Sequence, residues 1–377
     1  MIYFDNAATT FPKPETVAVS VANSINNLGN PSRGAYKLSL DASRVVYTTR
    51  EKIAKLFNLN NPLRVAFTSN ATESLNIAIN GLFSPCDHII TTEMEHNSVL
   101  RPVYTLNQNG IEVSIIKCDK NGNINYSQIE NEIKSNTKAV ICTHSSNLTG
   151  NLIDIKKIGE ICKNNNLLFI LDASQSAGVF DIDMKADNID VICFTGHKSL
   201  YGPQGTGGIC VKENITIRPL KTGGSGSISY SMHHPTTMPD ALEAGTVNSH
   251  SITGLLAGIE FIQSIGIEKI REHELKLMWQ FYNGIKNIDN IKIYGDFSTY
   301  LRAPIVALNI GAYDSSTISE ELANTYDIAT RAGAHCAPLM HKALGTKDQG
   351  AVRFSFSYFN TFEEINIAVN ALIQLCK

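Results

Sequence analysis

The sequence predicts an α/β fold, with a mostly parallel mixed sheet in a large domain and a smaller α+β domain at the C-terminal end. Over the first 250 residues, short apolar runs alternate with helical patterns, which is typical of strands covered on both faces. One further apolar run follows its predecessor too closely for a parallel crossover. Beyond a glycine-rich stretch, the pattern changes to long helices with a few short strands.

The strands of the large domain are expected at runs rich in Val, Ile, Leu and Phe. These runs are Arg64–Thr68, His88–Thr92, Glu112–Lys117, Lys138–His144, Leu167–Leu171 and Val191–Phe194. Helical patterns lie between them, for example at Ile155–Cys162. The alternation indicates a parallel sheet with helices on both faces.

The strand expected at Gly208–Lys212 is different. The segment TGHKSLYGPQGTG that precedes it is too short and too rich in glycine to form a crossover helix. We therefore expect this strand to run antiparallel, which makes the sheet mixed.

The second domain begins after Lys221–Asp240, which we expect to be a long functional loop or a hairpin. A helical pattern starts at Ser251, and strands are expected at Ile291–Tyr294, Ile305–Asn309 and Ala351–Ser357. We place the large domain at residues 15–250 and the small one at 251–377, with residues 1–14 packed on the small domain.

Composition excludes several classes of protein. The 377 residues are 43% hydrophobic and 18% charged, with a net charge of −3, so neither disorder nor a nucleic-acid or membrane partner is expected. No apolar run is long enough to span a membrane, and we expect no secretory signal. The eight cysteines form no CxxC pair, which indicates reduced thiols in a cytoplasmic protein.

No metal site is expected. The pair His233–His234 has no third ligand spaced nearby, so a solvated loop is the better interpretation. Four cysteines in apolar patterns are interpreted as small core residues: Cys142, Cys162, Cys193 and Cys210.

Polar side chains follow several of the expected strands. Because ligands bind outside the carboxyl ends of the strands in such sheets, these residues suggest one polar crevice. They are Asn147, Asp172, Gln175, Thr195, His197 and Lys198. After another strand, residues 69–72 form a capping sequence before a helix, whose N-terminus suits a phosphate. Neither a P-loop nor an early GxGxxG motif is present, which argues against a nucleoside triphosphate or a dinucleotide.

Asp172 and Lys198 indicate a particular cofactor. An aspartate that keeps a pyridine nitrogen protonated and a lysine that can form an imine are what pyridoxal 5′-phosphate (PLP) requires. The bound ring serves as an electron sink, and the lysine amine can move protons.

Nine motifs in family order make the chain resemble a fold type I PLP-dependent transferase of the class V aminotransferase family. Within that family it is most similar to the cysteine desulfurase and selenocysteine lyase group. The motifs are FDNAATT at 4–10, TSNATESLN at 68–76, TTEMEHNSV at 91–99, HSSNLTG at 144–150, DASQSAG at 172–178, FTGHKSLYGPQGTGG at 194–208, EAGTVN at 243–248, RAGAHCAPLMHK at 331–342 and VRFSFSYFNT at 352–361.

The resemblance implies a role for each matching residue. Lys198 would bind PLP as an imine and move the α-proton, Asp172 would pair with the ring nitrogen, and Gln175 would donate to the ring oxygen. His96 would stack on the ring. The phosphate would be bound by Ala71, Thr72, Thr195 and His197, and by Thr246 from the neighbouring subunit of a homodimer. Asn147 and Arg353 would hold the substrate carboxylate.

Cys336 would receive the sulfur. Gly333 permits a tight turn before it, and Pro338 can open a helix after it, which would place the sulfur near a helix N-terminus that favours a thiolate. The resemblance implies that L-cysteine becomes L-alanine while a persulfide forms on Cys336, for transfer to an acceptor that the sequence does not identify. The compact loop around Cys336 resembles the SufS-like branch.

Three alternatives stay open at this point. The chain could act on L-selenocysteine as a selenocysteine lyase, or catalyse another class V reaction such as transamination. A third, non-enzymatic interpretation is a PLP-binding sulfur carrier or assembly partner.

Overall fold

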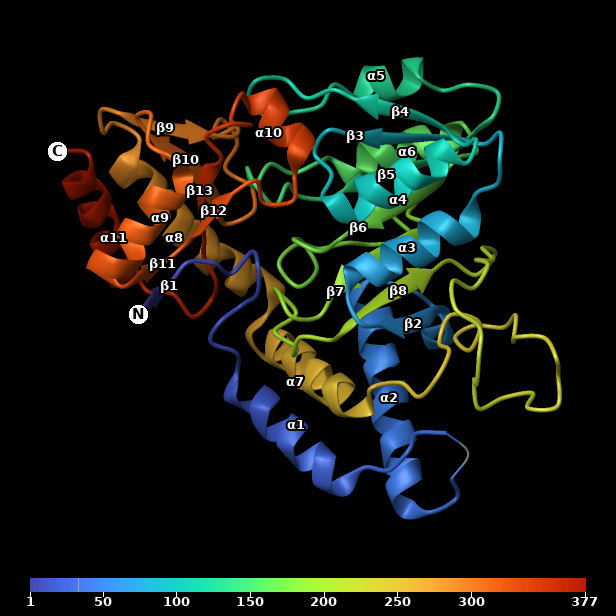
Figure 1. Cartoon of the computed structure of the whole chain (residues 1–377). Helices are drawn as coiled ribbons and strands as arrows, with labels where there is room; N and C mark the ends of the chain where they lie inside the picture. The colour runs from blue at the N-terminus through green and yellow to red at the C-terminus, as the bar shows by residue number, and fades with distance from the viewer. Residues whose placement is uncertain (33) are drawn as a thin grey trace.

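A computed structural model describes residues 1–32 and 34–377 of the chain. Its largest sheet has seven strands in the order β2-β8-β7-β6-β5-β3-β4 (Figure 1). Their bounds are β2 Val65–Thr68, β3 His88–Thr92, β4 Glu112–Ile116, β5 Thr137–Thr143, β6 Leu168–Asp172, β7 Val191–Thr195 and β8 Gly207–Val211. The first and last residues of each strand lie within one or two positions of those of the apolar run that predicted it.

The predicted direction of β8 is confirmed. It pairs antiparallel with β7 on one side and with β2 on the other. The pairs among β3, β4, β5, β6 and β7 are parallel. Because β8 is antiparallel to both β2 and β7, β2 runs in the same direction as β7. The carboxyl end of β2 therefore lies at the same edge of the sheet as the carboxyl ends of the parallel strands.

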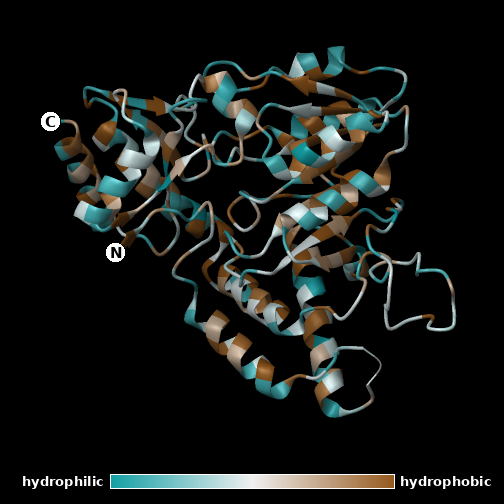
Figure 2. Ribbon diagram, viewed as in Figure 1, coloured by the Kyte–Doolittle hydropathy of each residue, from teal (hydrophilic) through white to brown (hydrophobic). Residues whose placement is uncertain are grey.

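Helices cover both faces of this sheet, as the apolar runs predicted. In β5, Val140 and Cys142 belong to one core cluster, whereas Ala139 and Ile141 belong to another. Such alternation places successive side chains on opposite faces of the sheet, and both faces are buried from solvent. Figure 2 shows the central strands as mainly hydrophobic. The helices of this region are α1 Glu15–Asn27, α2 Lys37–Leu56, α3 Ala71–Leu82, α4 Asn97–Gln108, α5 Tyr126–Asn131 and α6 Ile155–Asn164, with the 3₁₀ helix η1 at Pro62–Arg64.

The small C-terminal region has an antiparallel sheet of four strands, β12-β13-β10-β9. Its strands are β9 Ile291–Tyr294, β10 Ile305–Ile310, β12 Arg331–Gly333 and β13 Ala351–Ser355. The remaining helices are α7 Ser249–Ile265, α8 Ile267–Ile285, α9 Ser315–Tyr326, α10 Pro338–Leu344 and α11 Phe362–Leu375. A separate apolar core lies between this sheet and helices α8, α9 and α11.

Residues 2–5 pack on the small region, whereas the expected placement of residues 1–14 as a whole on that region stays a prediction. Strand β1, Ile2–Tyr3, pairs in parallel with β11, Ile328–Ala329. Asp5 then forms a bridge with Ser355 in β13. The N-terminal segment thus joins the small sheet before the chain enters the large region.

The expected domain boundary near residue 250 stays a prediction. Helix α7 packs against α1 and α2, and its buried side chains belong to the core of the large region. Most buried side chains of α8 join the small core. The packing partner therefore changes near Gly266, between the two helices.

The segment between β8 and α7 is a long loop. Of the two interpretations for Lys221–Asp240, a loop or a hairpin, the structure has the loop, because turns and bends replace strands there. Within the described part of the chain, no helix has the length and apolar character to cross a membrane.

Candidate active site

One cavity of about 550 Å³ lies at the carboxyl ends of the strands, between the large sheet and the small region. It collects the predicted site residues from segments far apart in the sequence. Those at its wall are Ala71, Thr72, His96, Asn147, Asp172, Gln175, Thr195, His197, Lys198, Cys336 and Arg353. The single polar crevice predicted from the strand ends is therefore present.

Thr246 is the exception. It lines a second cavity of about 440 Å³, beside Arg50 and Glu243 and away from the other site residues. Arg50 and Glu243 form a buried ion pair of 2.6 Å under this cavity. The expected role of Thr246 toward a neighbouring subunit stays a prediction.

The first wall of the main cavity is the N-terminus of α3. Asn70 caps this helix, since its side chain accepts a hydrogen bond of 3.0 Å from the Glu73 amide. Gly207 in β8 lies against it, and a Cβ there would come within 2.7 Å of the Asn70 backbone. Free amide groups at this end and the hydroxyl of Thr72 provide donors for an anion.

Ser98 is a site residue that the sequence reasoning missed. Its hydroxyl lies 2.7 Å from that of Thr72 and 2.8 Å from Nδ1 of His96. It also lines the cavity. Its place two residues after His96, in the first turn of α4, is the signal that could have found it.

His96 is a neutral ring at the cavity wall. As the N-cap of α4, it accepts a hydrogen bond of 3.1 Å on Nδ1 from the Ser98 amide. Burial lowers its pKa to about 4, and the positive charge of Lys198 acts in the same direction. An uncharged ring suits contact with an aromatic ligand.

Asp172 and Lys198 face the same space. Asp172 ends β6, and its Oδ1 accepts hydrogen bonds from the amide and the hydroxyl of Ser174. Burial lowers the pKa of Lys198 to about 8, although the charge of Asp172 opposes this shift. A lysine in this state is partly an uncharged amine near neutral pH, which is the nucleophilic form.

Gln175, Thr195 and His197 complete this side. Gln175 donates from Nε2 to the Ala7 carbonyl at 2.9 Å, which orients the amide. Thr195 ends β7. Burial lowers the pKa of His197 to about 4, and its Nδ1 is buried without a partner among the described residues.

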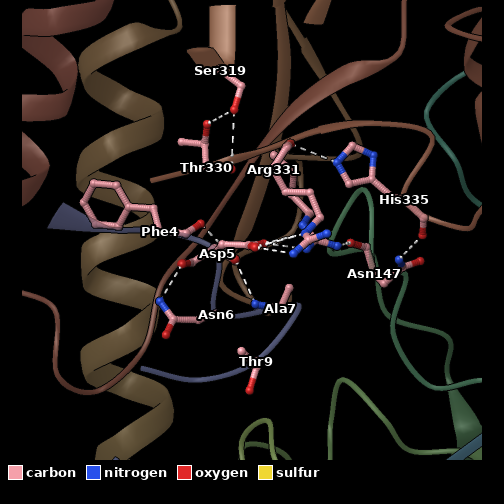
Figure 3. Close-up of polar contacts among 12 residues, drawn as sticks. Phe4, Asp5, Asn6, Ala7, Thr9, Asn147, Ser319, Thr330, Arg331 and His335 are labelled. Carbon is pink, nitrogen blue, oxygen red and sulfur yellow. Dashed lines mark hydrogen bonds and ion pairs between the residues drawn. The ribbon is translucent and has the colours of Figure 1, made fainter. Parts of the chain in front are cut away.

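Arg353 is buried in β13 and held from two sides. It donates from Nη1 to the Asn147 carbonyl at 2.9 Å and from Nη2 to Oδ1 of Asp5 at 3.0 Å. Its Nε is buried with no partner in the described chain, so one strong donor stays available. Arg331 binds the same Asp5 carboxylate, at 2.7 Å from Nη2 (Figure 3).

Asp5 and Arg331 were not predicted as site residues. Both lie inside motifs that carried the resemblance, FDNAATT and RAGAHCAPLMHK, but nothing in their local sequence shows that they meet. Their contact joins the first residues of the chain to β12.

Cys336 lies on a tight loop at the mouth of the cavity. Its side chain is exposed, and its carbonyl accepts a hydrogen bond of 2.7 Å from the amide of Asn97. Pro338 opens α10 at its first position and Gly333 has a φ of 98°, as the sequence predicted for the turn. Cys142, Cys162, Cys193 and Cys210 are buried, in agreement with their interpretation as core residues.

The fold and this site define the class of protein. The chain belongs to the class-V aminotransferase family, whose sequence model matches residues 2–367. It is 33% identical to a probable cysteine desulfurase of Methanothermobacter thermautotrophicus, over 99% of this chain and 94% of that protein. It is 32% identical to the cysteine desulfurase IscS of Photobacterium profundum, over 98% and 91% of the two chains.

Solved structures agree. The apo cysteine desulfurase of Thermococcus onnurineus superposes with a TM-score of 0.94 at 32% identity, covering 100% of this chain and 94% of that one. The cysteine desulfurase CsdA of Escherichia coli, in an S-sulfonic acid form, has a TM-score of 0.89 at 26% identity over 99% and 94%. These findings agree with the predicted family and fold type, whereas the SufS-like branch stays a prediction.

Proposed function

We propose that this chain is a PLP-dependent cysteine desulfurase, which converts L-cysteine to L-alanine and leaves the sulfur as a persulfide on Cys336. The observation that carries this proposal is the meeting of Lys198 and Cys336 at one cavity. Asp172 and Arg353 line the same space, so groups for a pyridine ring, a carboxylate and a sulfur atom are present together.

The donor set fits PLP. The α3 N-terminus, Thr72 and the partnerless Nδ1 of His197 offer donors to a phosphate. Asp172 has one carboxylate oxygen bound by Ser174, which leaves the other for a pyridinium nitrogen. Gln175 uses one N–H on Ala7, and its amide nitrogen carries a second. When bound, PLP supplies an electron sink for the substrate carbon.

The substrate carboxylate is assigned to Arg353 and Asn147. The guanidinium of Arg353 is already oriented by Asp5 and by the Asn147 carbonyl, and its Nε is free to donate. A fixed planar fork of this kind matches a carboxylate. Lys198 lines the same cavity, so an amino acid bound by its carboxylate at Arg353 would share that space with the lysine amine.

Proton movement is assigned to Lys198. Its pKa of about 8 lets the amine accept a proton from the substrate α-carbon and return it near neutral pH. Cys336 Sγ then forms a bond to the substrate sulfur as the carbon–sulfur bond breaks. The electron pair of that bond stays on the substrate carbon, which takes up a proton, and the sulfur remains on Cys336 as a persulfide.

Further parts of the proposal concern partners and location. We infer a homodimer in which Thr246 reaches the phosphate site of the neighbouring subunit, and a cytoplasmic protein that passes sulfur to an acceptor. The separate position of Thr246, away from the cavity of its own chain, supports the first point. The two packing units support a large PLP-binding domain and a small C-terminal one.

The test is mass spectrometry of the PLP-loaded protein after incubation with L-cysteine alone. We expect L-alanine in solution and the added mass of one sulfur atom on the peptide that carries Cys336. C336A should form neither, while C86A, which removes another exposed cysteine, should behave as the wild type. A need for a keto acid would favour transamination instead, and an adduct confined to other cysteines would refute the assignment of Cys336.

A further inference from the structure

Two buried histidines and a threonine form a chain of hydrogen bonds beneath Cys336. Nε2 of His335 lies 3.1 Å from the Arg331 carbonyl, and its Nδ1 lies 3.3 Å from Nε2 of His341. Nδ1 of His341 lies 2.7 Å from the hydroxyl of Thr346. The two rings are nearly parallel, with an angle of 7° between them. We call this set, from Thr346 to Arg331, the histidine chain.

The contacts fix the tautomers of both rings. A carbonyl oxygen only accepts, so Nε2 of His335 carries a hydrogen and its Nδ1, in the neutral ring, accepts. His341 must then donate from Nε2, which makes its own Nδ1 the acceptor of the Thr346 hydroxyl. The histidine chain therefore has one direction, from Thr346 through His341 to His335.

If His335 became positively charged, the direction of hydrogen-bond donation along the histidine chain would have to reverse. A proton on its Nδ1 would require His341 to hold its hydrogen on Nδ1, with the Thr346 hydroxyl turned toward the His341 carbonyl at 3.4 Å. Burial opposes that state, and so do the positive charges of Arg353 and Arg331, which together with His341 are the titratable groups facing His335. His335 is thus held neutral with both ring nitrogens occupied, and it has no free nitrogen to act as a base on Cys336.

The loop above the histidine chain has an unfavourable backbone. His335 and Cys336 have φ values of 51° and 54°, in the left-handed region that non-glycine residues seldom adopt. Such conformations persist where surrounding contacts impose them. The backbone contacts are those of the His335 carbonyl with Asn147 Nδ2 and of the Cys336 carbonyl with the Asn97 amide, both 2.7 Å. The histidine chain is the contact that holds the His335 side chain.

We propose that His341 is a positioning residue for the sulfur acceptor: by donating from Nε2 to His335, it holds the strained loop so that Cys336 faces the cavity. The inference rests on the proposed role of Cys336. The position of the Cys336 loop is expected to depend on a hydrogen-bond donor at position 341. It should depend neither on a positive charge nor on an aromatic ring at that position.

Two substitutions separate the donor from the ring. H341Q keeps an N–H near the place of Nε2, and H341L keeps bulk but has no donor. The matched control is K342A, on the exposed face of the same helix. In each protein, the persulfide formed on Cys336 in a single turnover is followed by mass spectrometry. Histidine tautomers are read in the same proteins from ¹⁵N NMR of the imidazole nitrogens.

We expect hydrogens on Nε2 of both His335 and His341 in the wild type. Persulfide formation should fall about tenfold or more in H341L, because a small displacement of a reacting atom is costly. H341Q and K342A should stay within about twofold of the wild type, since both keep the donor. In H341L the freed Nδ1 of His335 should also accept a proton at a higher pH than in the wild type.

The inference is overturned if H341L forms the persulfide as fast as the wild type, if H341Q loses as much as H341L, or if His341 carries its hydrogen on Nδ1. A failure of the proposed function looks different. The wild type itself would then form no persulfide on Cys336, while the NMR spectra would still report whether the histidine chain has the stated direction.

Discussion

Replacing Glu95 by glutamine should remove a pH dependence from the stability of the protein. The Glu95 side chain is fully buried behind the cavity. Its Oε1 accepts hydrogen bonds from the Thr92 hydroxyl at 2.7 Å and the Thr143 amide at 3.1 Å, and its Oε2 is buried with no partner in the described chain. Burial raises the pKa of this carboxyl from 4.5 to about 8, and the negative charge of Asp172 adds to the shift.

The sign and size follow from these values. Between its unfolded and folded pKa values, the unfolded chain releases the proton of Glu95 while the folded protein keeps it. The free energy of unfolding therefore falls as the pH rises through this window, by about 1.4 kcal/mol per pH unit. From about pH 5.5 to about pH 7.5 the loss is about 3 kcal/mol.

E95Q cannot ionise, yet it keeps an acceptor for Thr92 and Thr143. Its amide N–H₂ replaces the partnerless O–H of the protonated acid, so near pH 5.5 the two proteins should have similar stability. With an unfolding entropy of about 2.1 cal/mol/K per residue, 3 kcal/mol corresponds to a Tm difference of about 3 to 4 °C for this chain. The variant should gain this advantage over the wild type by about pH 7.5.

The assay is thermal unfolding followed by circular dichroism at the two pH values, with protein and PLP concentrations held constant. E160Q, on the exposed side of α6, controls for the general effect of changing a glutamate to glutamine. Parallel Tm-against-pH curves for E95Q and the wild type would refute the reasoning, because they would mean that Glu95 takes up no proton on folding.

Three further predictions concern other charged groups. R353K should raise KM for L-cysteine about tenfold or more, since an ammonium cannot replace a charge-assisted guanidinium fork; an unchanged KM contradicts this. K198A should lose the visible absorbance of PLP on desalting while C336A keeps it, and retention in K198A would exclude the covalent link. E243Q should leave Arg50 as a buried, unpaired cation and cost about 3 to 5 kcal/mol of stability. D41N, at an exposed ion pair, should cost about 1 kcal/mol or less in the same denaturant titration, and equal losses would argue against a buried pair.

Local patterns predicted much of the fold, for a physical reason. A strand buried on both faces, such as β6, must be apolar at almost every position, so its bounds can be read from the chain. The direction of β8 was predictable because too few residues precede it for a crossover. Residues at strand ends, such as Asp172 and Thr195, followed from the same sheet geometry.

Contacts between distant segments were not predictable in this way. Asp5 meets Arg353, which is 348 positions away, only because β1 pairs with β11 and the chain then bridges at Asp5 to β13. Ser98 likewise meets the Thr72 hydroxyl, 26 positions away, only in the folded chain. The motifs contained most residues of the cavity wall, whereas the groups that orient Arg353 and Cys336 are seen only in the folded structure.

The course of the first ten residues has a practical consequence for handling the protein. Met1 pairs through its amino group with Asp327, the Asp5 carboxylate holds two arginines, and the amide of Thr10 reaches the His197 carbonyl at 3.1 Å. An affinity tag fused ahead of Met1 would remove the amino-terminal charge that pairs with Asp327, at the start of a segment that reaches His197 at the main cavity. A purification handle attached after Lys377 would leave these contacts in place, because α11 ends at Leu375 and Lys377 is exposed.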